Sequence, residues 1–123
     1  MDFSLNSEQQ MIQDSVSKFI LNDYDFETRR KIIESTTGFS QENWRLFAEL
    51  GWLMLPFTEE DGGLGGSMVD LMLVMEEFGK GMVVEPFLAT AVMSGGLIAM
   101  AGNQTQKDDY LPRIMAGELQ KAF

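Results

Sequence analysis

Residues Leu50–Gly81 read LGWLMLPFTEEDGGLGGSMVDLMLVMEEFGKG, and this stretch decides the fold. It opens with a helix end and a short apolar run that Pro56 closes. The glycine-rich segment 61–66 then predicts a tight loop, because glycine accepts the backbone conformations that turns require. Ser67 fits the start of an apolar helix that we expect to run to Phe78. Helix, loop and helix without alternating strand patterns favour an all-α domain.

Composition limits the classes of function. With 123 residues, 45% of them apolar, the chain is long enough for a single domain (residues 1–123) with a sizeable core. The net charge of −10 makes nucleic acid a poor partner, because phosphate binding needs clustered Lys and Arg. The basic run 29–31 is flanked by acids and is typical of a solvated helix face.

The absence of Cys and His excludes further kinds of site. Thiol nucleophiles, disulfides, Cys/His zinc sites and imidazole acid–base chemistry all need residues that this sequence lacks. We therefore predict no metal site. No apolar stretch reaches the ~18 residues of a membrane span, and the start of the chain lacks the pattern of a secretory signal. We expect no membrane insertion and a cytoplasmic, bacterial location.

Helical periodicity predicts about five to six helices. The first opens with a Ser7/Gln10 capping box. The helix after Pro86 is apolar on nearly every side, which is typical of a central helix, and Gly95-Gly96 in its middle suggest a close approach by another group. The other expected helices cover Phe26–Glu34, Ser40–Leu50, Phe87–Ala101 and Thr105–Leu111, with a further turn from Pro112 to Met115.

The glycine loop fits no cofactor motif. A P-loop needs a Lys that is missing, and a dinucleotide fingerprint needs glycine where Met68 stands. The acids Glu59, Glu60 and Asp61 lack the alternating ligands of a calcium loop. We interpret the loop as a tight turn that leads into a capped helix. Ser67 at the start of an acidic, Met-rich helix also suggests an acyl carrier-like protein, although the Asp-Ser-Leu signature is absent.

Several segments, in this order and spacing, resemble the acyl-CoA dehydrogenase family along nearly the whole chain. Each motif alone is weakly specific, but their order is fairly specific. The segments are, in chain order, Phe3–Gln10, Glu49–Pro56, Glu60–Gly66, Met75–Gly81, Val84–Thr90 and Ala101–Glu118. Of these, Val84–Thr90 is similar to bacterial members, including small subunits of pimeloyl-CoA-type dehydrogenases.

The resemblance implies the amino-terminal helical domain of an FAD-dependent enzyme, in which the helices form an orthogonal or up-down bundle. In that family FAD accepts a hydride from the β-carbon of an acyl-CoA thioester while a Glu of a later domain removes the α-proton. The family's flavin-binding motif begins just after the position of Phe123, so no acid of this chain is expected to be catalytic. We expect the β-sheet flavin domain and the carboxy-terminal helical bundle to be absent. Glu76 and Glu77 are adjacent on a helix and so do not face each other.

The resemblance also implies one wall of the acyl pocket and a set of partners. By position, Phe123 is expected to approach the flavin, while simple core packing is an equal alternative for each wall residue. Acyl-CoA, electron-transfer flavoprotein and a homo- or hetero-oligomer are the implied partners. The residues assigned to the wall are Glu85, Pro86, Ala89, Thr90 and Met93.

Three hypotheses therefore stand at this point. The first is the amino-terminal domain of an acyl-CoA dehydrogenase, the second an acyl carrier-like protein with Ser67. The third is a non-catalytic subunit or helical interaction module of a heteromeric dehydrogenase. We expect the chain alone to be inactive, without bound flavin, and prone to self-association through exposed apolar residues.

Overall fold

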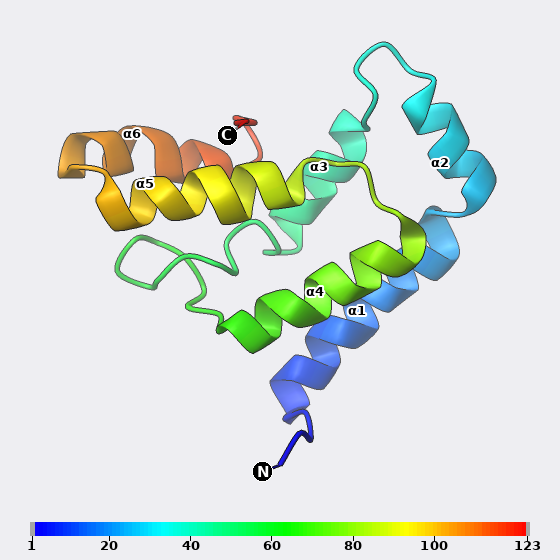
Figure 1. Cartoon of the computed structure of the whole chain (residues 1–123), viewed down its shortest axis with the longest axis horizontal. Coiled ribbons are helices and arrows are strands. Elements are labelled where there is room, and N and C mark those ends of the chain that lie inside the picture. The colour runs from blue at the N-terminus through cyan, green and yellow to red at the C-terminus, as the bar shows by residue number, and fades with distance from the viewer. Residues whose placement is uncertain (1, 123) are drawn as a thin grey trace. The chain divides into compact units, whose positions relative to one another are not determined.

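The computed structural model describes residues 2–122, and within them it is entirely helical, without strands (Figure 1). The all-α prediction is confirmed. The chain divides into two compact groups, which are described separately. The first holds the chain up to Gly38 together with Met68–Val84, and the second holds Phe39–Ser67 and the chain from Glu85 onward. The elements are α1 (Ser7–Asp23), α2 (Phe26–Ile33), α3 (Gln41–Glu49), α4 (Met68–Gly81), the π-helix η1 (Leu88–Ser94), α5 (Gly95–Ala101) and α6 (Gln104–Met115).

In the first group, α1 and α4 pack side by side in the same direction (Figure 1). Near their starts the Gln9 amide donates to Asp70 Oδ1 at 3.0 Å, a pair 61 residues apart. Near their ends Ile20 and Gly81, again 61 apart (81 − 20), are in contact. A Cβ at Gly81 would lie 2.8 Å from Ile20 Cδ1, so glycine allows the close approach. The constant offset defines a parallel, in-register pair.

The start of α1 corrects one prediction. The helix does begin at Ser7, but its capping box is formed by Asn6 and Gln9 rather than by Ser7 and Gln10. Asn6 Oδ1 accepts from the Gln9 N–H at 2.8 Å, and Gln9 Oε1 accepts from the Asn6 N–H at 3.1 Å. Asn serves as an N-cap at least as well as Ser, so two overlapping boxes were available one residue apart.

The end of α4 differs from its predicted end at Phe78. The helix continues through Gly79 to Gly81, and the left-handed residue that ends it is Met82, with φ of 51°. The Val83 N–H donates to the Phe78 carbonyl at 3.0 Å, the closing bond of a Schellman motif. Glycine usually takes this position, so Met82 carries backbone strain.

The second group buries aromatic residues of α3 and of the turns that follow it. Ser40 caps α3 as predicted, its hydroxyl accepting from the Asn43 N–H at 3.1 Å. Gly51 has φ of 80° and ends α3 in the predicted left-handed conformation. α6 runs without interruption from Gln104 to Met115, so Pro112 lies inside one helix instead of starting a new turn. The buried aromatic residues are Trp44, Phe47, Trp52 and Phe57.

The helix predicted over residues 87–101 is present, but its first half is π-helical, which the sequence did not predict. At the junction the Gly95 N–H donates to the Thr90 carbonyl, five residues earlier. A Cβ on Gly95 would lie 2.6 Å from the Phe57 ring, whereas one on Gly96 would meet nothing within 4 Å. The predicted close approach is therefore made at Gly95 alone.

Candidate functional site

The backbone amides of the glycine loop are used inside the loop. The N–H groups of residues 61–66 donate to carbonyl oxygens of residues 54–59, at 2.7 to 3.1 Å. Such amides are not available to cradle a phosphate, because a nest must leave its N–H groups unpaired. Packing explains the glycines instead: a Cβ on Gly63 would overlap the Phe57 backbone. The three shortest of these hydrogen bonds, at 2.7 to 2.8 Å, join Gly63 to Thr58, Gly65 to Phe57 and Gly66 to Leu55.

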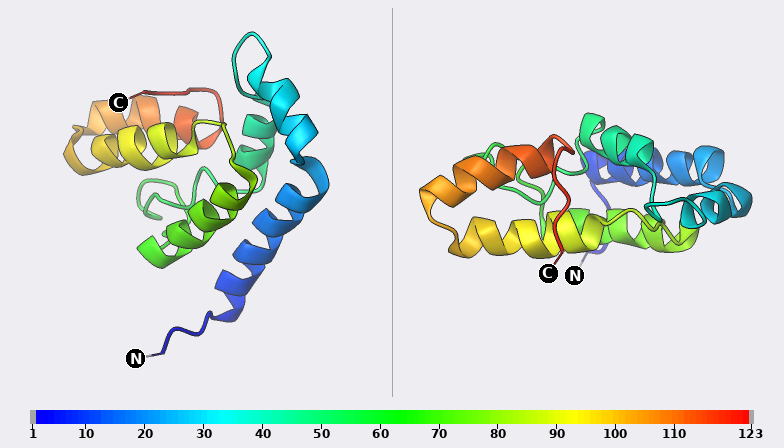
Figure 2. Two further views of the ribbon diagram at one scale, coloured as in Figure 1. Left: turned by 45° about the vertical axis from the view of Figure 1, so that its right-hand side comes forward. Right: turned by 90° about the horizontal axis from the view of Figure 1, so that it is seen from above.

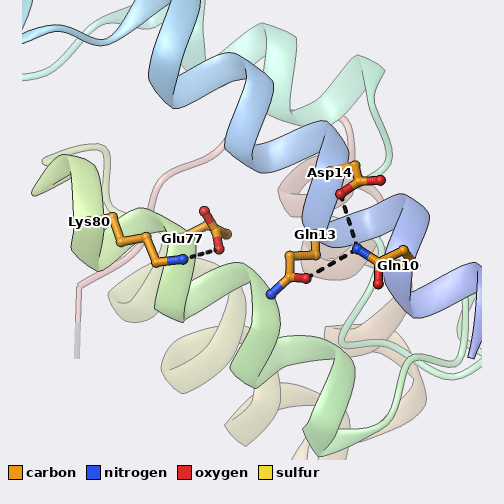
Figure 3. Close-up of polar contacts among 5 residues, drawn as sticks. All are labelled: Gln10, Gln13, Asp14, Glu77 and Lys80. Carbon is orange, nitrogen blue, oxygen red and sulfur yellow. Dashed lines mark hydrogen bonds and ion pairs between the residues drawn. The ribbon is translucent and has the colours of Figure 1, made fainter. Parts of the chain in front are cut away.

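The acidic residues of α4 do not form a catalytic pair. Glu77 is buried, with 3% of its surface exposed, while Glu76 faces solvent. Glu77 Oε1 lies 2.6 Å from Lys80 Nζ (Figure 3), and this hydrogen bond is the main reason that the pKa of Lys80 is raised. The two neighbouring carboxylates thus point apart, as the helical geometry requires. Across the described residues, no three acidic side chains come together as a metal site.

Glu85 lies at the entrance to η1 and is buried, with 4% of its surface exposed. Its carboxylate accepts from the Ser40 N–H at 3.2 Å and from the Asn43 side-chain amide at 3.4 Å. The carboxylate therefore sits at the amino terminus of α3, where the helix dipole and unpaired N–H groups favour a negative charge. The polar atoms of this predicted wall residue hold α3 to the start of η1.

Thr90 is fully buried within η1. Its hydroxyl donates to the carbonyl of Lys121 at 2.8 Å and accepts from the Lys121 N–H at 3.0 Å. The Lys121 ammonium in turn lies 4.6 Å from the centre of the Tyr110 ring on α6. The carboxy-terminal segment is thus attached to both η1 and α6.

The remaining predicted wall residues are apolar and open to one side. Pro86 and Ala89 are half-buried, and Met93 is 43% exposed. Leu97 is 51% exposed. Ala89, Met93 and Leu97 recur every four residues, and we call them the η1–α5 stripe. Phe123, predicted to approach a flavin, lies outside the described residues.

Sequence patterns did not identify Asn43 or Lys121 as partners of the wall. Asn43 stands three residues after the Ser40 cap, where a polar side chain at a helix start needs no long-range partner to explain it. Lys121 contributes backbone atoms, which carry no residue-type signal. In the part of the chain that the structure covers, no helix is long and apolar enough to cross a membrane.

Known proteins match this chain over almost its full length. The sequence profile described as "Acyl-CoA dehydrogenase, N-terminal domain" matches residues 6–118. Acryloyl-CoA reductase (NADH) of Anaerotignum propionicum is 32% identical over 100% of the chain and 31% of the relative. The short-chain specific acyl-CoA dehydrogenase of Clostridium acetobutylicum is 30% identical over 96% of the chain and 31% of the relative.

A solved structure shows the same arrangement of helices. The crystal structure of the ChsE4–ChsE5 complex from Mycobacterium tuberculosis has a TM-score of 0.80 and 28% identity, and it covers 98% of this chain and 30% of the matched one. The chain spans about a third of the length of these relatives. On the profile match above all, this chain belongs to the acyl-CoA dehydrogenase family, in which it corresponds to the amino-terminal helical domain.

Proposed function

We propose that the whole protein catalyses FAD-dependent α,β-dehydrogenation of acyl-CoA thioesters and that this domain supplies one wall of the acyl pocket. The family match over residues 6–118 carries the proposal. It also favours this function over the acyl carrier-like alternative, since Ser67 directly precedes α4 in a domain of dehydrogenase type. Electron-transfer flavoprotein is the proposed electron acceptor.

The wall is assigned to residues at the start of the helix run 86–101. Pro86, Ala89 and Met93 present apolar surface, and an acyl chain is bound by such surface because its burial removes apolar area from water. Glu85 and Thr90 are assigned to the same wall, but their polar atoms are hydrogen-bonded to Ser40 and Lys121 within the protein. Their proposed contribution is to hold the wall in place.

We propose that the phosphates of FAD, which the family implies, are bound outside residues 2–122. In support of this, the loop amides are hydrogen-bonded internally, Arg30 pairs with Glu27, and Arg29 donates to the Met82 carbonyl. Pyrophosphate binding needs free N–H groups or clustered cations. We therefore propose no flavin contact for these residues and assign flavin binding to other parts of the whole protein, with Phe123 as the proposed contact of this chain.

The test is dehydrogenation by the full-length gene product. Saturated acyl-CoAs of increasing chain length are incubated with the purified protein and an electron-accepting dye. The masses of the products are then measured by mass spectrometry. We expect loss of two hydrogens from the acyl group, matched by two electrons passed to the dye. One relative is a reductase, so the reverse reaction is assayed with a 2-enoyl-CoA as well. Failure in both directions would reject the proposed reaction.

A matched pair of substitutions tests the wall. Ala89→Phe adds a ring on the open face of η1, and Ala116→Phe makes the same change at the exposed end of α6, away from the η1–α5 stripe. We expect Ala89→Phe to lower kcat/KM for the longest accepted acyl chain by about tenfold or more, because the ring displaces roughly two methylenes of the chain from buried contact. Ala116→Phe is expected to leave kcat/KM within about twofold on the same scale. Equal effects at both positions would reject the wall assignment.

The 123-residue chain alone is proposed to be inactive. Purified without the rest of the protein, it should show no flavin absorbance and convert no acyl-CoA. Its exposed apolar residues favour self-association, which light scattering against concentration would detect. The most exposed of the large apolar residues are Met100, Phe3, Met68 and Leu21.

A second candidate is a subunit of a heteromeric dehydrogenase. The ChsE4–ChsE5 structure, which this chain resembles at 28% identity, is described as a complex of two proteins. Co-expression of the full-length protein with the product of an adjacent dehydrogenase gene tests this candidate. A mixed oligomer whose activity exceeds that of either protein alone is the expected result. Full activity in a homo-oligomer would reject it.

A further inference from the structure

The carboxy-terminal segment is tied back to the wall by one side chain. It leaves α6 at Met115 and runs across to η1 (Figure 2). There the Thr90 hydroxyl both donates to and accepts from the backbone of Lys121, at 2.8 and 3.0 Å, across 31 residues of sequence. A hydroxyl offers one donor and two acceptor sites, so this reciprocal contact uses its donor and one acceptor.

The side chain of Lys121 makes a second contact, with α6. The Lys121 ammonium lies 4.6 Å from the centre of the Tyr110 ring, which belongs to α6. A cation over an aromatic ring at this distance is attracted to it. Lys121 therefore links η1 to α6, through its backbone on one side and its side chain on the other. We call this arrangement the Thr90–Lys121 tie.

The tie lies where the helix needs support. η1 is π-helical, a geometry that is rare and usually limited to a single turn because it is less favourable than the α-helix. Thr90 occupies the point where the π-turn closes, since its carbonyl accepts from the Gly95 N–H. A buried Thr that is bonded across the chain fixes the rotation of this turn. That rotation decides whether Ala89 and Met93 face the open side.

We propose that Thr90 is a positioning residue for the acyl-pocket wall and that the Lys121 backbone is its anchor. The proposal rests on the proposed function for its role in substrate binding, whereas the tie itself does not. Thr90 keeps η1 in its π-helical register and thereby keeps the η1–α5 stripe (Ala89, Met93 and Leu97) directed toward the acyl chain. The segment 119–122 is required as well, because it carries the Lys121 backbone atoms that bind the Thr90 hydroxyl.

The first experiment measures amide hydrogen exchange in the full-length protein. In the wild type we expect the Lys121 amide to be protected at least about tenfold over its unstructured rate, although it lies outside any helix. In Thr90→Val, which keeps the shape but removes the hydroxyl, protection should fall about three- to tenfold, the value of one hydrogen bond. An unprotected Lys121 amide in the wild type would overturn the tie, whether or not the variant folds.

Two controls accompany this measurement. Thr90→Ser keeps the hydroxyl and should retain Lys121 protection within about twofold of wild type. Thr105→Val makes the same chemical change at an exposed position of α6 and should also stay within about twofold. Equal loss in Thr90→Val and Thr90→Ser would overturn the role of the hydroxyl.

The second experiment measures steady-state kinetics of the full-length enzyme. Thr90→Val should raise KM for a long-chain acyl-CoA by about three- to tenfold with kcat within about twofold, and Thr90→Ser should restore KM. General loss of folded enzyme lowers the apparent kcat and leaves KM unchanged, so that pattern would overturn the positioning role. If no acyl-CoA reacts with the wild type, the proposed function fails, while hydrogen exchange still decides the tie.

Discussion

Two glycine-to-alanine substitutions in the second group are expected to change stability in opposite directions. At Gly63 an added Cβ would lie 2.5 Å from the Phe57 Cβ and still closer to the Phe57 carbonyl oxygen. These atoms are backbone or directly attached to it, and Phe57 is buried, so they cannot rotate away. The loop must shift and lose the 2.8 Å bond from the Gly63 N–H to Thr58. Overpacking of 1–3 kcal/mol and the lost bond together give a cost of about 3 kcal/mol.

Gly96 is the matched control, since an added Cβ there meets nothing within 4 Å. Its replacement by Ala in α5 should stabilise the domain by about 1 kcal/mol, because Ala loses less backbone freedom than Gly in a helix. The two variants should thus differ by about 4 kcal/mol, or roughly 12–16 °C in Tm for a chain of this length. Urea and thermal unfolding followed by far-ultraviolet circular dichroism measure both. A neutral Gly63→Ala would refute the view that the loop glycines serve packing.

Substitutions at three further positions test the caps and the buried carboxylate. Met82→Gly should raise the free energy of unfolding in urea by about 0.5 to 1 kcal/mol, because glycine relieves the left-handed strain; a loss would show that the Met side chain packs. Glu85→Ala should lower it by about 1–3 kcal/mol, since the Ser40 N–H loses its acceptor, and Glu85→Gln should cost less; the reverse order contradicts this account. Hydrogen bonds from Thr28 lower the pKa of Asp25 below its ordinary 3.8, so its contribution is present above that pH and is lost as pH falls. Asp25→Asn should therefore show a shallower fall of stability than wild type between about pH 5 and pH 2, and parallel curves would count against it.

Much of the helical framework follows from local signals. Ser40 and Gly51 mark the two ends of α3 through side-chain and backbone preferences that act within a few residues. The loop glycines were also interpreted as structural from the sequence, and their internal hydrogen bonds bear that out. Local interactions of this kind do not depend on the rest of the fold, so the sequence is sufficient to predict them.

The differences arise where distant residues override local preference. α4 passes Gly79 and ends at Met82, whose carbonyl accepts from Arg29 Nε of α2 at 2.7 Å. A partner 53 residues away can hold a strained residue that no local rule would place there. The π-turn of η1 has the same origin, because Thr90 and Gly95 are fixed by contacts with Lys121 and Phe57. No periodicity in the sequence contains that information.

The residues proposed for the acyl-pocket wall are of two kinds, and this difference changes how their variants must be interpreted. Sequence position assigned Glu85 and Thr90 to the acyl pocket together with Ala89 and Met93. Both polar side chains are buried and bonded to Ser40 and Lys121, whereas the two apolar ones are open to one side. A buried polar group without its partner is costly, so a change at Glu85 or Thr90 is expected to disturb the backbone that carries the proposed wall. Reduced acyl-CoA binding in such a variant therefore reports wall geometry, and direct contact must be tested at Ala89 and Met93.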